Sequence, residues 1–296
     1  MEHLEEAGIH SGDSTCFIPP QNVPAHVLAE VEDWTRIIGV ELGIRGCYNI
    51  QFAIRDEVLH VLEVNPRGSR TFPFVAKATG VPLARIAARL ALGEKLSELN
   101  VPEPQTEAVC VKAPVFPFIK LRGLDPAPGP EMKSTGEVMG SHARPAAAYL
   151  KARLATELPV PVEGGVYITV KDGDKLAIID EARRLQEMGF TLYATRGTAH
   201  VLRDVGELDV RTCYRIAERR SPDALDLMRQ GNIHLVINTP RLTGGAVLDG
   251  NMMRRLAVEL NIPFVTTMAG AHMEVEAIGE AMNGMPEPRL LEIGSL

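Results

Sequence analysis

Two neighbouring runs of the chain carry oxygen-bearing side chains at alternate positions, the spacing that places them on one face of a β-strand. Glu63 and Asn65 alternate in one run, and Asn49 and Gln51 alternate in the other. One carboxylate with neutral amide oxygens suits Mg²⁺ bridged to nucleotide phosphates. If the strands pair as a hairpin, Gln51, Glu63 and Asn65 are therefore expected to form a metal and phosphate site.

The register of this hairpin decides whether the site can form. A plain two-residue turn at Asp56 and Glu57 would set Gln51 opposite Leu62. Gln51 faces Glu63 only if the turn has an odd number of residues or if a β-bulge shifts the register. The spacing alone fits a solvated polar hairpin face equally well.

Two arginines follow the second strand directly. Arg67 and Arg70 carry guanidinium groups that can bind a carboxylate or a phosphate through two parallel hydrogen bonds. They are candidates for contact with a reacting phosphoryl group, and the alternative is that they are ordinary surface arginines.

A second candidate site lies where several expected strands end. Thr195 and Thr198 flank the point at which a strand passes into a helix, where free backbone N–H groups can hold a phosphate. The carboxyl ends of parallel strands are where open α/β sheets bind ligands. Other polar residues expected near this edge are Lys175, Arg215, Asn238 and Thr239. The alternative is that both threonines only cap the helix.

Hydrophobic spacing predicts the elements that position these residues. Three parts are expected: residues 1–100, a proline-rich connecting segment at 101–156, and residues 157–296. In the first part we expect helices at Val27–Leu42 and Pro82–Leu92 and strands at Cys47–Arg55 and Val58–Val64. The connecting segment reads as irregular chain with short strands and a helix at Ala146–Leu154.

The third part alternates strands with helices, which predicts an α/β fold with a parallel sheet covered by helices on both faces. The expected strands are Val166–Val170, Thr191–Ala194, Ile233–Asn238 and Phe264–Thr267. The expected helices are Lys175–Met188, Ser221–Arg229, Asn251–Leu260 and Ala271–Met282.

Composition limits the classes of function. The 296 residues include 45% hydrophobic residues and carry a net charge of −7, which argues against binding to nucleic acid or to an anionic membrane. No apolar run approaches the roughly 20 residues of a membrane span. The four cysteines are widely spaced, as expected for reduced thiols of a cytoplasmic protein.

Several motifs in order resemble one family. Residues 49–52 with Glu63–Arg67 look like the metal-binding end of the ATP-grasp fold. Together with residues 1–14, 77–84 and 129–140, they resemble the large chains of carbamoyl phosphate synthetases, at the end of their second ATP-grasp domain. The stretch after residue 157 resembles the methylglyoxal synthase-like domain, a Rossmann-like domain, that ends these chains.

The resemblance implies a role for each candidate residue. Gln51, Glu63 and Asn65 would bind Mg²⁺ or Mn²⁺, and the first two would also contact ATP. Arg67 and Arg70 would meet the transferred phosphoryl group or carbamate. The nucleotide site would further be lined, largely by backbone groups, by Gly8, Ile9, His10 and Ser11. The six polar residues at the sheet edge would bind a phosphorylated effector.

The activity implied is ATP-dependent phosphorylation of carbamate to carbamoyl phosphate, with glutamine or ammonia as nitrogen source, for pyrimidine and arginine biosynthesis. The implied partners are the N-terminal part of the large chain and a glutaminase small subunit, and assembly into a homo-oligomer is compatible with the family. Earlier ATP-grasp strands would precede the counterpart of Met1, so the isolated chain is expected to be inactive.

Two alternatives stay open at this point. The chain could be a non-catalytic module that only senses an effector, or, less favoured, a methylglyoxal synthase-type lyase, whose catalytic aspartate and histidine are not recognisable around 215–223 or 238–242. Ornithine regulation is not carried over. Glu5 and Asp13 are retained, but Ala113 follows Lys112 where ornithine-responsive members have a glutamate.

Overall fold

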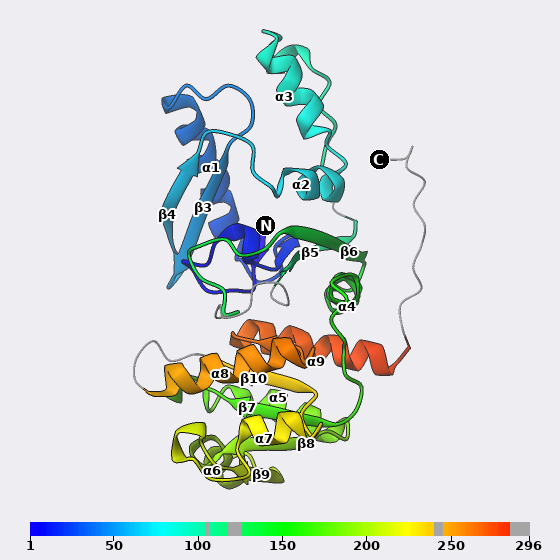
Figure 1. Ribbon diagram of the computed structural model, residues 1–296. Coiled ribbons are helices and arrows are strands. Elements are labelled where there is room, and N and C mark those ends of the chain that lie inside the picture. Colours follow the sequence, from blue (N-terminus) through cyan, green and yellow to red (C-terminus); the bar gives the residue numbers. More distant parts are fainter. Residues whose placement is uncertain (105–106, 118–125, 240–244, 285–296) are drawn as a thin grey trace.

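The computed structural model describes residues 1–104, 107–117, 126–239 and 245–284. The end of the predicted third part, and most of the stretch 238–242, therefore lie outside the described residues. Three sheets organise the described chain. The sheets have two, four and five strands. In Figure 1 the first two sheets lie in the upper half and the third lies below, with a long helix between the upper and lower parts.

The upper part contains a hairpin with helices beside it. The hairpin is formed by β3 (Asn49–Arg55) and β4 (Val58–Asn65), and helix α1 (Ala25–Glu41) lies against it. Asp56 and Glu57 have φ angles of 52° and 62°, so the turn has only these two residues and follows the twist of the strands. Helices α2 (Phe72–Thr79) and α3 (Leu83–Ala91) follow, of which α2 was not predicted.

The four-stranded sheet joins distant segments. Short strands β1 (Glu2–His3) and β2 (Cys16–Ile18) pair in the order β1-β2-β5-β6 with β5 (Val109–Val115) and β6 (Gly136–His142), all antiparallel. Helix α4 (Pro145–Ala155) packs on β5 and β6. Gly140 permits this approach, because a Cβ there would lie 2.1 Å from the carbonyl oxygen of Ala148. The connecting segment is thus built into the sheet that carries the N-terminus.

The lower sheet is parallel throughout, as the alternating pattern predicts. Its strand order is β11-β10-β7-β8-β9. The strands are β7 (Gly165–Thr169), β8 (Thr191–Thr195), β9 (Val210–Cys213), β10 (Leu235–Asn238) and β11 (Phe264–Val265). The helices are α5 (Ile178–Glu187), α6 (Arg196–Asp204), α7 (Ala224–Arg229), α8 (Gly245–Glu259) and α9 (Met268–Met282).

Apolar side chains bury both faces of this sheet. One cluster gathers Ile168 with Ile178, Leu202 and Val275 from α5, α6 and α9. The other gathers residues of α7 and α8 around Val236 and is likewise closed to solvent. The α/β prediction for this part is confirmed, and the carboxyl ends of β7, β8 and β10 meet at one edge.

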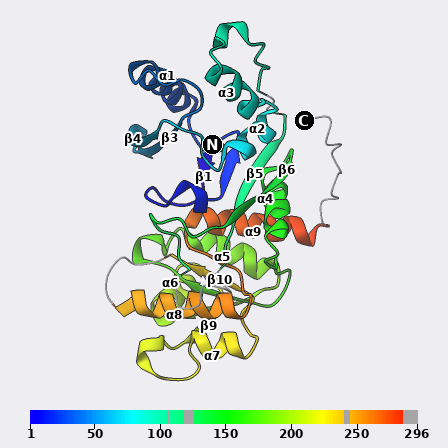
Figure 2. The same cartoon turned by 45° about the horizontal axis from the view of Figure 1, so that its top comes forward.

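Helix α9 joins the two halves of the molecule (Figures 1 and 2). It packs on α5 below and on α4 above. The buried carboxylate of Glu274 accepts hydrogen bonds from the Tyr149 hydroxyl at 2.7 Å and from Arg153 Nε at 3.1 Å. Among the residues that the structure describes, no helix combines the length and the hydropathy that crossing a membrane requires.

Candidate functional site

A β-bulge brings the predicted metal ligands together. Gln51 pairs with Glu63 while the next residue, Phe52, pairs with Val61, so Leu62 is the extra residue of the bulge. The turn is the two-residue one that alone would have separated Gln51 from Glu63. Of the two solutions that the register allowed, the bulge is therefore the one that the chain adopts.

The side chains on this face leave oxygen atoms for a cation. Asn65 Nδ2 donates to Glu63 Oε1 at 3.0 Å, and Gln51 Nε2 donates to the carbonyl oxygen of Ile9 at 3.3 Å. Because both amides use their nitrogens in these bonds, their carbonyl oxygens remain for a metal ion beside the Glu63 carboxylate. One carboxylate with neutral oxygens on a solvent-accessible face fits Mg²⁺ or Mn²⁺ bound jointly with phosphate oxygens.

The segment from Gly8 to Ser11 lies against this face through Ile9. Gly8 has a φ of 97°, a left-handed conformation that favours glycine, and it turns the chain after β1. His10 is fixed at both ends, because its backbone N donates to Gly129 O at 2.9 Å and its Nδ1 accepts from Gly12 N at 3.0 Å. The structure thus places the expected nucleotide segment next to the expected metal ligands.

The two arginines differ in their contacts. Arg67 is exposed and donates to Gly68 O at 3.1 Å. Arg70 reaches across to the connecting segment, where Nη1 donates to Ser134 O at 3.0 Å and contacts the Met132 sulfur. The motif at 129–140, which had no chemical role in the sequence analysis, therefore positions Arg70.

That support continues into the nucleotide segment. Ser134 Oγ donates to Gly12 O at 3.1 Å, and Asp13 accepts from the backbone nitrogens of Lys133 and Ser134 at 2.7 and 2.9 Å. The fully buried Lys112 donates from Nζ to Ser11 O at 2.9 Å and to Gly12 O at 3.3 Å. Lys112 and Ser134 are positioning residues that local sequence could not reveal, since their partners are about a hundred positions away.

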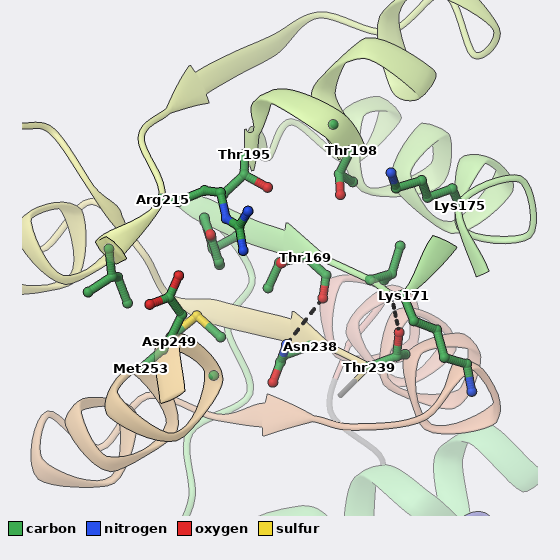
Figure 3. Close-up of a pocket in the computed structure, with 15 residues that line it drawn as sticks. Thr169, Lys171, Lys175, Thr195, Thr198, Arg215, Asn238, Thr239, Asp249 and Met253 are labelled. Carbon is green, nitrogen blue, oxygen red and sulfur yellow. Dashed lines mark hydrogen bonds between the residues drawn. The ribbon is translucent and has the colours of Figure 1, made fainter. Parts of the chain in front are cut away.

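The second candidate site is a cavity of about 170 Å³ at the carboxyl edge of the parallel sheet (Figure 3). It is lined by all six predicted effector residues: Lys175, Thr195, Thr198, Arg215, Asn238 and Thr239. Figure 3 shows the Lys175 amino group and the Arg215 guanidinium directed toward the space between the threonines and β7. The structure thus places these six residues around one cavity, and their role in binding an effector stays a prediction.

The threonines are not used as helix caps. Thr195 occupies the N-cap position of α6, but its side chain makes no capping hydrogen bond. Thr198, one turn along, is 3% exposed and faces the cavity. Two hydroxyls and the free N–H groups of α6 therefore point at the same space as Lys175 Nζ, which lies 2.8 Å from Asp172 Oδ1. This arrangement suits a phosphate group.

The floor of the cavity is held in place by buried hydrogen bonds. Asn238 is 6% exposed, and its Nδ2 donates to Thr169 O at 3.2 Å while its Oδ1 accepts from Arg254 at 2.6 Å. Thr239 Oγ1 accepts from the backbone nitrogen of Lys171 at 2.9 Å and keeps its own proton for a ligand. Asn238 thus orients the edge of β10 as well as lining the cavity.

Some lining residues were missed by the sequence analysis. Asp249 and Met253 come from α8, and Tyr167 and Lys171 come from β7 and the loop after it. Only Lys171 carried a usable signal, namely its place just after an expected strand. Among the described lining residues there is an aspartate but no histidine.

A larger cavity, of about 610 Å³, lies at the junction of the two halves. Glu5, Asp13, Ala113 and Pro114 line it together with Arg153. Burial raises the pKa of the Glu5 carboxyl to about 7, although the side chain still faces the cavity. Both carboxylate oxygens of Asp13 accept hydrogen bonds from backbone N–H groups, and Ala113 contributes no carboxylate. The described lining of this cavity therefore includes the carboxylates of Glu5, Asp13 and Glu157, with no carboxylate at position 113.

Comparisons with known proteins agree with the expected order of the domains. Residues 1–99 match the model of the "Carbamoyl-phosphate synthase L chain, ATP binding domain", and residues 177–266 match the "MGS-like domain". The large chain of carbamoyl phosphate synthase from Methanothermobacter thermautotrophicus is 48% identical over 94% of this chain and 26% of its own length. The Archaeoglobus fulgidus large chain is 46% identical with the same coverage.

A third relative matches a larger share of its own length. "Carbamoyl phosphate synthase large chain, C-terminal section" from Methanocaldococcus jannaschii is 46% identical over 96% of this chain and 47% of the relative. The chain therefore spans between about a quarter and a half of the curated relatives it matches. Both domain matches occur in the order that the motifs predicted, and this chain belongs to the carbamoyl phosphate synthase large-chain family as the counterpart of its C-terminal part.

Proposed function

We propose that this chain supplies the metal-binding end of an ATP site and an effector domain to a carbamoyl phosphate synthase. The reaction is phosphorylation of carbamate by ATP to give carbamoyl phosphate and ADP, with glutamine or ammonia as nitrogen source, for pyrimidine and arginine biosynthesis. The observation that carries the proposal is the bulge that sets Gln51 opposite Glu63, with Asn65 beside them.

The residues of this face have separate tasks. Glu63 with the amide oxygens of Gln51 and Asn65 would hold Mg²⁺ or Mn²⁺, which neutralises phosphate oxygens when bound. Arg67 and Arg70 donate to the oxygens of the transferred phosphoryl group or carbamate, and they stabilise its charge without covalent chemistry. The backbone from Gly8 to Ser11 contacts the nucleotide, and the contact of Ile9 with Gln51 sets its distance from the metal ligands.

The test uses the large chain that contains this sequence, combined with its glutaminase small subunit, which we propose as a partner. Glu63→Gln keeps the shape of the side chain and removes the metal-binding charge. We expect kcat to fall at least about 100-fold, the size of effect seen when one transition-state contact is lost. Glu57→Gln, at the exposed turn of the same hairpin, is the control. Activity of Glu63→Gln within about threefold of that control would refute the assignment.

We propose further that the cavity at the sheet edge binds a phosphorylated effector. The α6 N-terminus, Thr195, Thr198 and Lys175 would hold the phosphate, and Arg215 would add a second cation. Asp249, across the cavity, would repel a second anionic group and accept hydrogen bonds from hydroxyl or N–H groups. A phosphate ester on a neutral, hydroxylated body, such as a nucleoside monophosphate, therefore fits best.

Calorimetric titration of the chain with UMP, IMP and ornithine tests this second proposal. Thr195→Ala and Lys175→Ala should each weaken binding of the nucleotide that binds, by about tenfold, since hydrogen bonds to charged groups are worth about 1.5 kcal/mol or more. Lys95→Ala replaces an exposed lysine that does not line the cavity, and it should leave the nucleotide affinity unchanged. A nucleotide affinity that neither cavity substitution changes would refute the site.

We propose that the protein is cytoplasmic, in keeping with its four free cysteines.

A further inference from the structure

Lys171 lines the phosphate cavity but directs its charge elsewhere. Its backbone nitrogen donates to Thr239 Oγ1 at 2.9 Å, which fixes the residue at the rim of the cavity. Figure 3 shows its amino group pointing away from the central space, whereas the Lys175 amino group points toward Thr198. The two lysines of the cavity are therefore placed differently, although both extend from the segment that follows β7.

The Lys171 amino group instead joins the other half of the molecule. Nζ lies 3.1 Å from Glu6 Oε1 and 3.8 Å from Asp174 Oδ2. Glu6 belongs to the turn that leads into the expected nucleotide segment, and its carbonyl oxygen accepts from Ile9 N at 3.3 Å. The carbonyl oxygen of Ile9 in turn accepts from Gln51, one of the expected metal ligands. Lys171 thus connects the rim of one site with the backbone of the other.

We infer that Lys171 is a shared cation, for which Glu6 and a phosphate in the cavity compete. The inference rests on the proposed effector function, because it requires a phosphate ester in the cavity. A lysine has a flexible stem and three rotating donors, so one residue can serve either partner. The Glu6 side chain is 69% exposed, which makes its ion pair weak and easily exchanged for contact with a dianion.

Two consequences follow from this competition. Neutralising Glu6 removes the nearer carboxylate partner of Lys171 and leaves Asp174 at 3.8 Å, so it tightens phosphate binding by the worth of one exposed ion pair, about 1.5- to fivefold. Binding of a phosphate withdraws Lys171 from Glu6 and loosens the turn before Ile9. Because coupling between two sites is reciprocal, the same factor relates occupancy of the cavity to the conformation of the nucleotide segment.

The experiment measures UMP and inorganic phosphate binding to the full chain by calorimetry. The variants are Glu6→Gln, Lys171→Met and the double substitution, and Glu32→Gln, exposed on α1, is the matched control for loss of a surface carboxylate. We expect Glu6→Gln to tighten both ligands about 1.5- to fivefold. Lys171→Met should weaken both, and in its background Glu6→Gln should have no effect.

Hydrogen–deuterium exchange provides the second readout. UMP should accelerate exchange at the Ile9 amide in the wild-type chain and leave it unchanged in Lys171→Met. The inference is overturned if Glu6→Gln changes phosphate affinity no more than Glu32→Gln does, or if Glu6→Gln still tightens binding in the Lys171→Met background. It is also overturned if UMP leaves the exchange rate of the Ile9 amide unchanged in the wild-type chain. Tight UMP binding that is lost in Thr195→Ala would still uphold the effector site in those cases. Failure of the wild-type chain to bind either phosphate would overturn both proposals.

Discussion

Truncation of Glu274 should destabilise the junction between the two halves of the molecule by several kcal/mol. Its carboxylate is fully buried and accepts from Tyr149 and from both Arg153 Nε and Nη2, the latter at 3.3 Å. Glu274→Ala leaves the Arg153 guanidinium, 11% exposed, and a buried hydroxyl without an acceptor. Breaking a buried pair costs about 3–5 kcal/mol, and the junction cavity that Arg153 lines is large enough for water to solvate part of the guanidinium. We therefore expect about 3 kcal/mol.

Urea unfolding followed by circular dichroism measures this loss. Glu276→Ala is the matched control, because Glu276 lies on the same helix and pairs with Arg184 at the surface; its loss should cost less than about 1 kcal/mol. Replacing the whole set by apolar residues, as Tyr149→Phe, Arg153→Met and Glu274→Leu, should recover most of the stability, since no buried charge remains unpaired. A Glu274→Ala loss no larger than that of Glu276→Ala would refute the reasoning.

Three further outcomes are expected. Thr198→Val should weaken UMP binding about 10- to 150-fold, since a hydrogen bond to a charged group is worth about 1.5–3 kcal/mol, while Thr212→Val on the exposed edge strand should not. Asp249→Asn should tighten inorganic phosphate about two- to fivefold in the same titration, because it removes a nearby negative charge. Burial raises the pKa of Glu5 from 4.5 to about 7, so the native state holds a proton that the unfolded state releases. The free energy of unfolding should therefore fall as pH rises from about 5 to 7. Urea unfolding of the Glu5→Gln variant at the same pH values should not show this fall.

Local patterns were sufficient where structure depends on neighbouring residues. Alternation predicted β3 and β4, and the apolar runs predicted β7, β8 and β10, whose carboxyl ends line the cavity at the sheet edge. The bulge at Leu62 was only one of two options, because a two-residue turn and an odd one are both compatible with the residues near 56. The choice depends on how the hairpin packs, and the local sequence does not specify this packing.

Contacts over long sequence distances were not predictable in this way. The sheet β1-β2-β5-β6 joins residues about a hundred positions apart, and strands as short as β1 carry no periodicity. Lys112 has the residue type of a surface position, yet it is buried. Its amino group donates to two backbone carbonyl oxygens and lies 3.7 Å from the Glu137 carboxylate. Asp249 was missed because α8 begins earlier than predicted and brings its first turns over the cavity.

The turn between β1 and the nucleotide segment is where the two candidate sites meet. Thr267, at the start of α9, donates to Leu4 O at 3.0 Å, and Lys171 forms an ion pair with Glu6. The carbonyl oxygen of Ile9 accepts a hydrogen bond from the Gln51 side chain. Each contact is worth about 1 kcal/mol or less, so no single one can switch the molecule between states. A ligand shifts an equilibrium only by its difference in affinity for the two states, and couplings between sites are typically about 1–3 kcal/mol. If the proposed effector function holds, a few weak contacts on this turn would let a ligand in the cavity tune the proposed ATP site by a modest factor without turning it off.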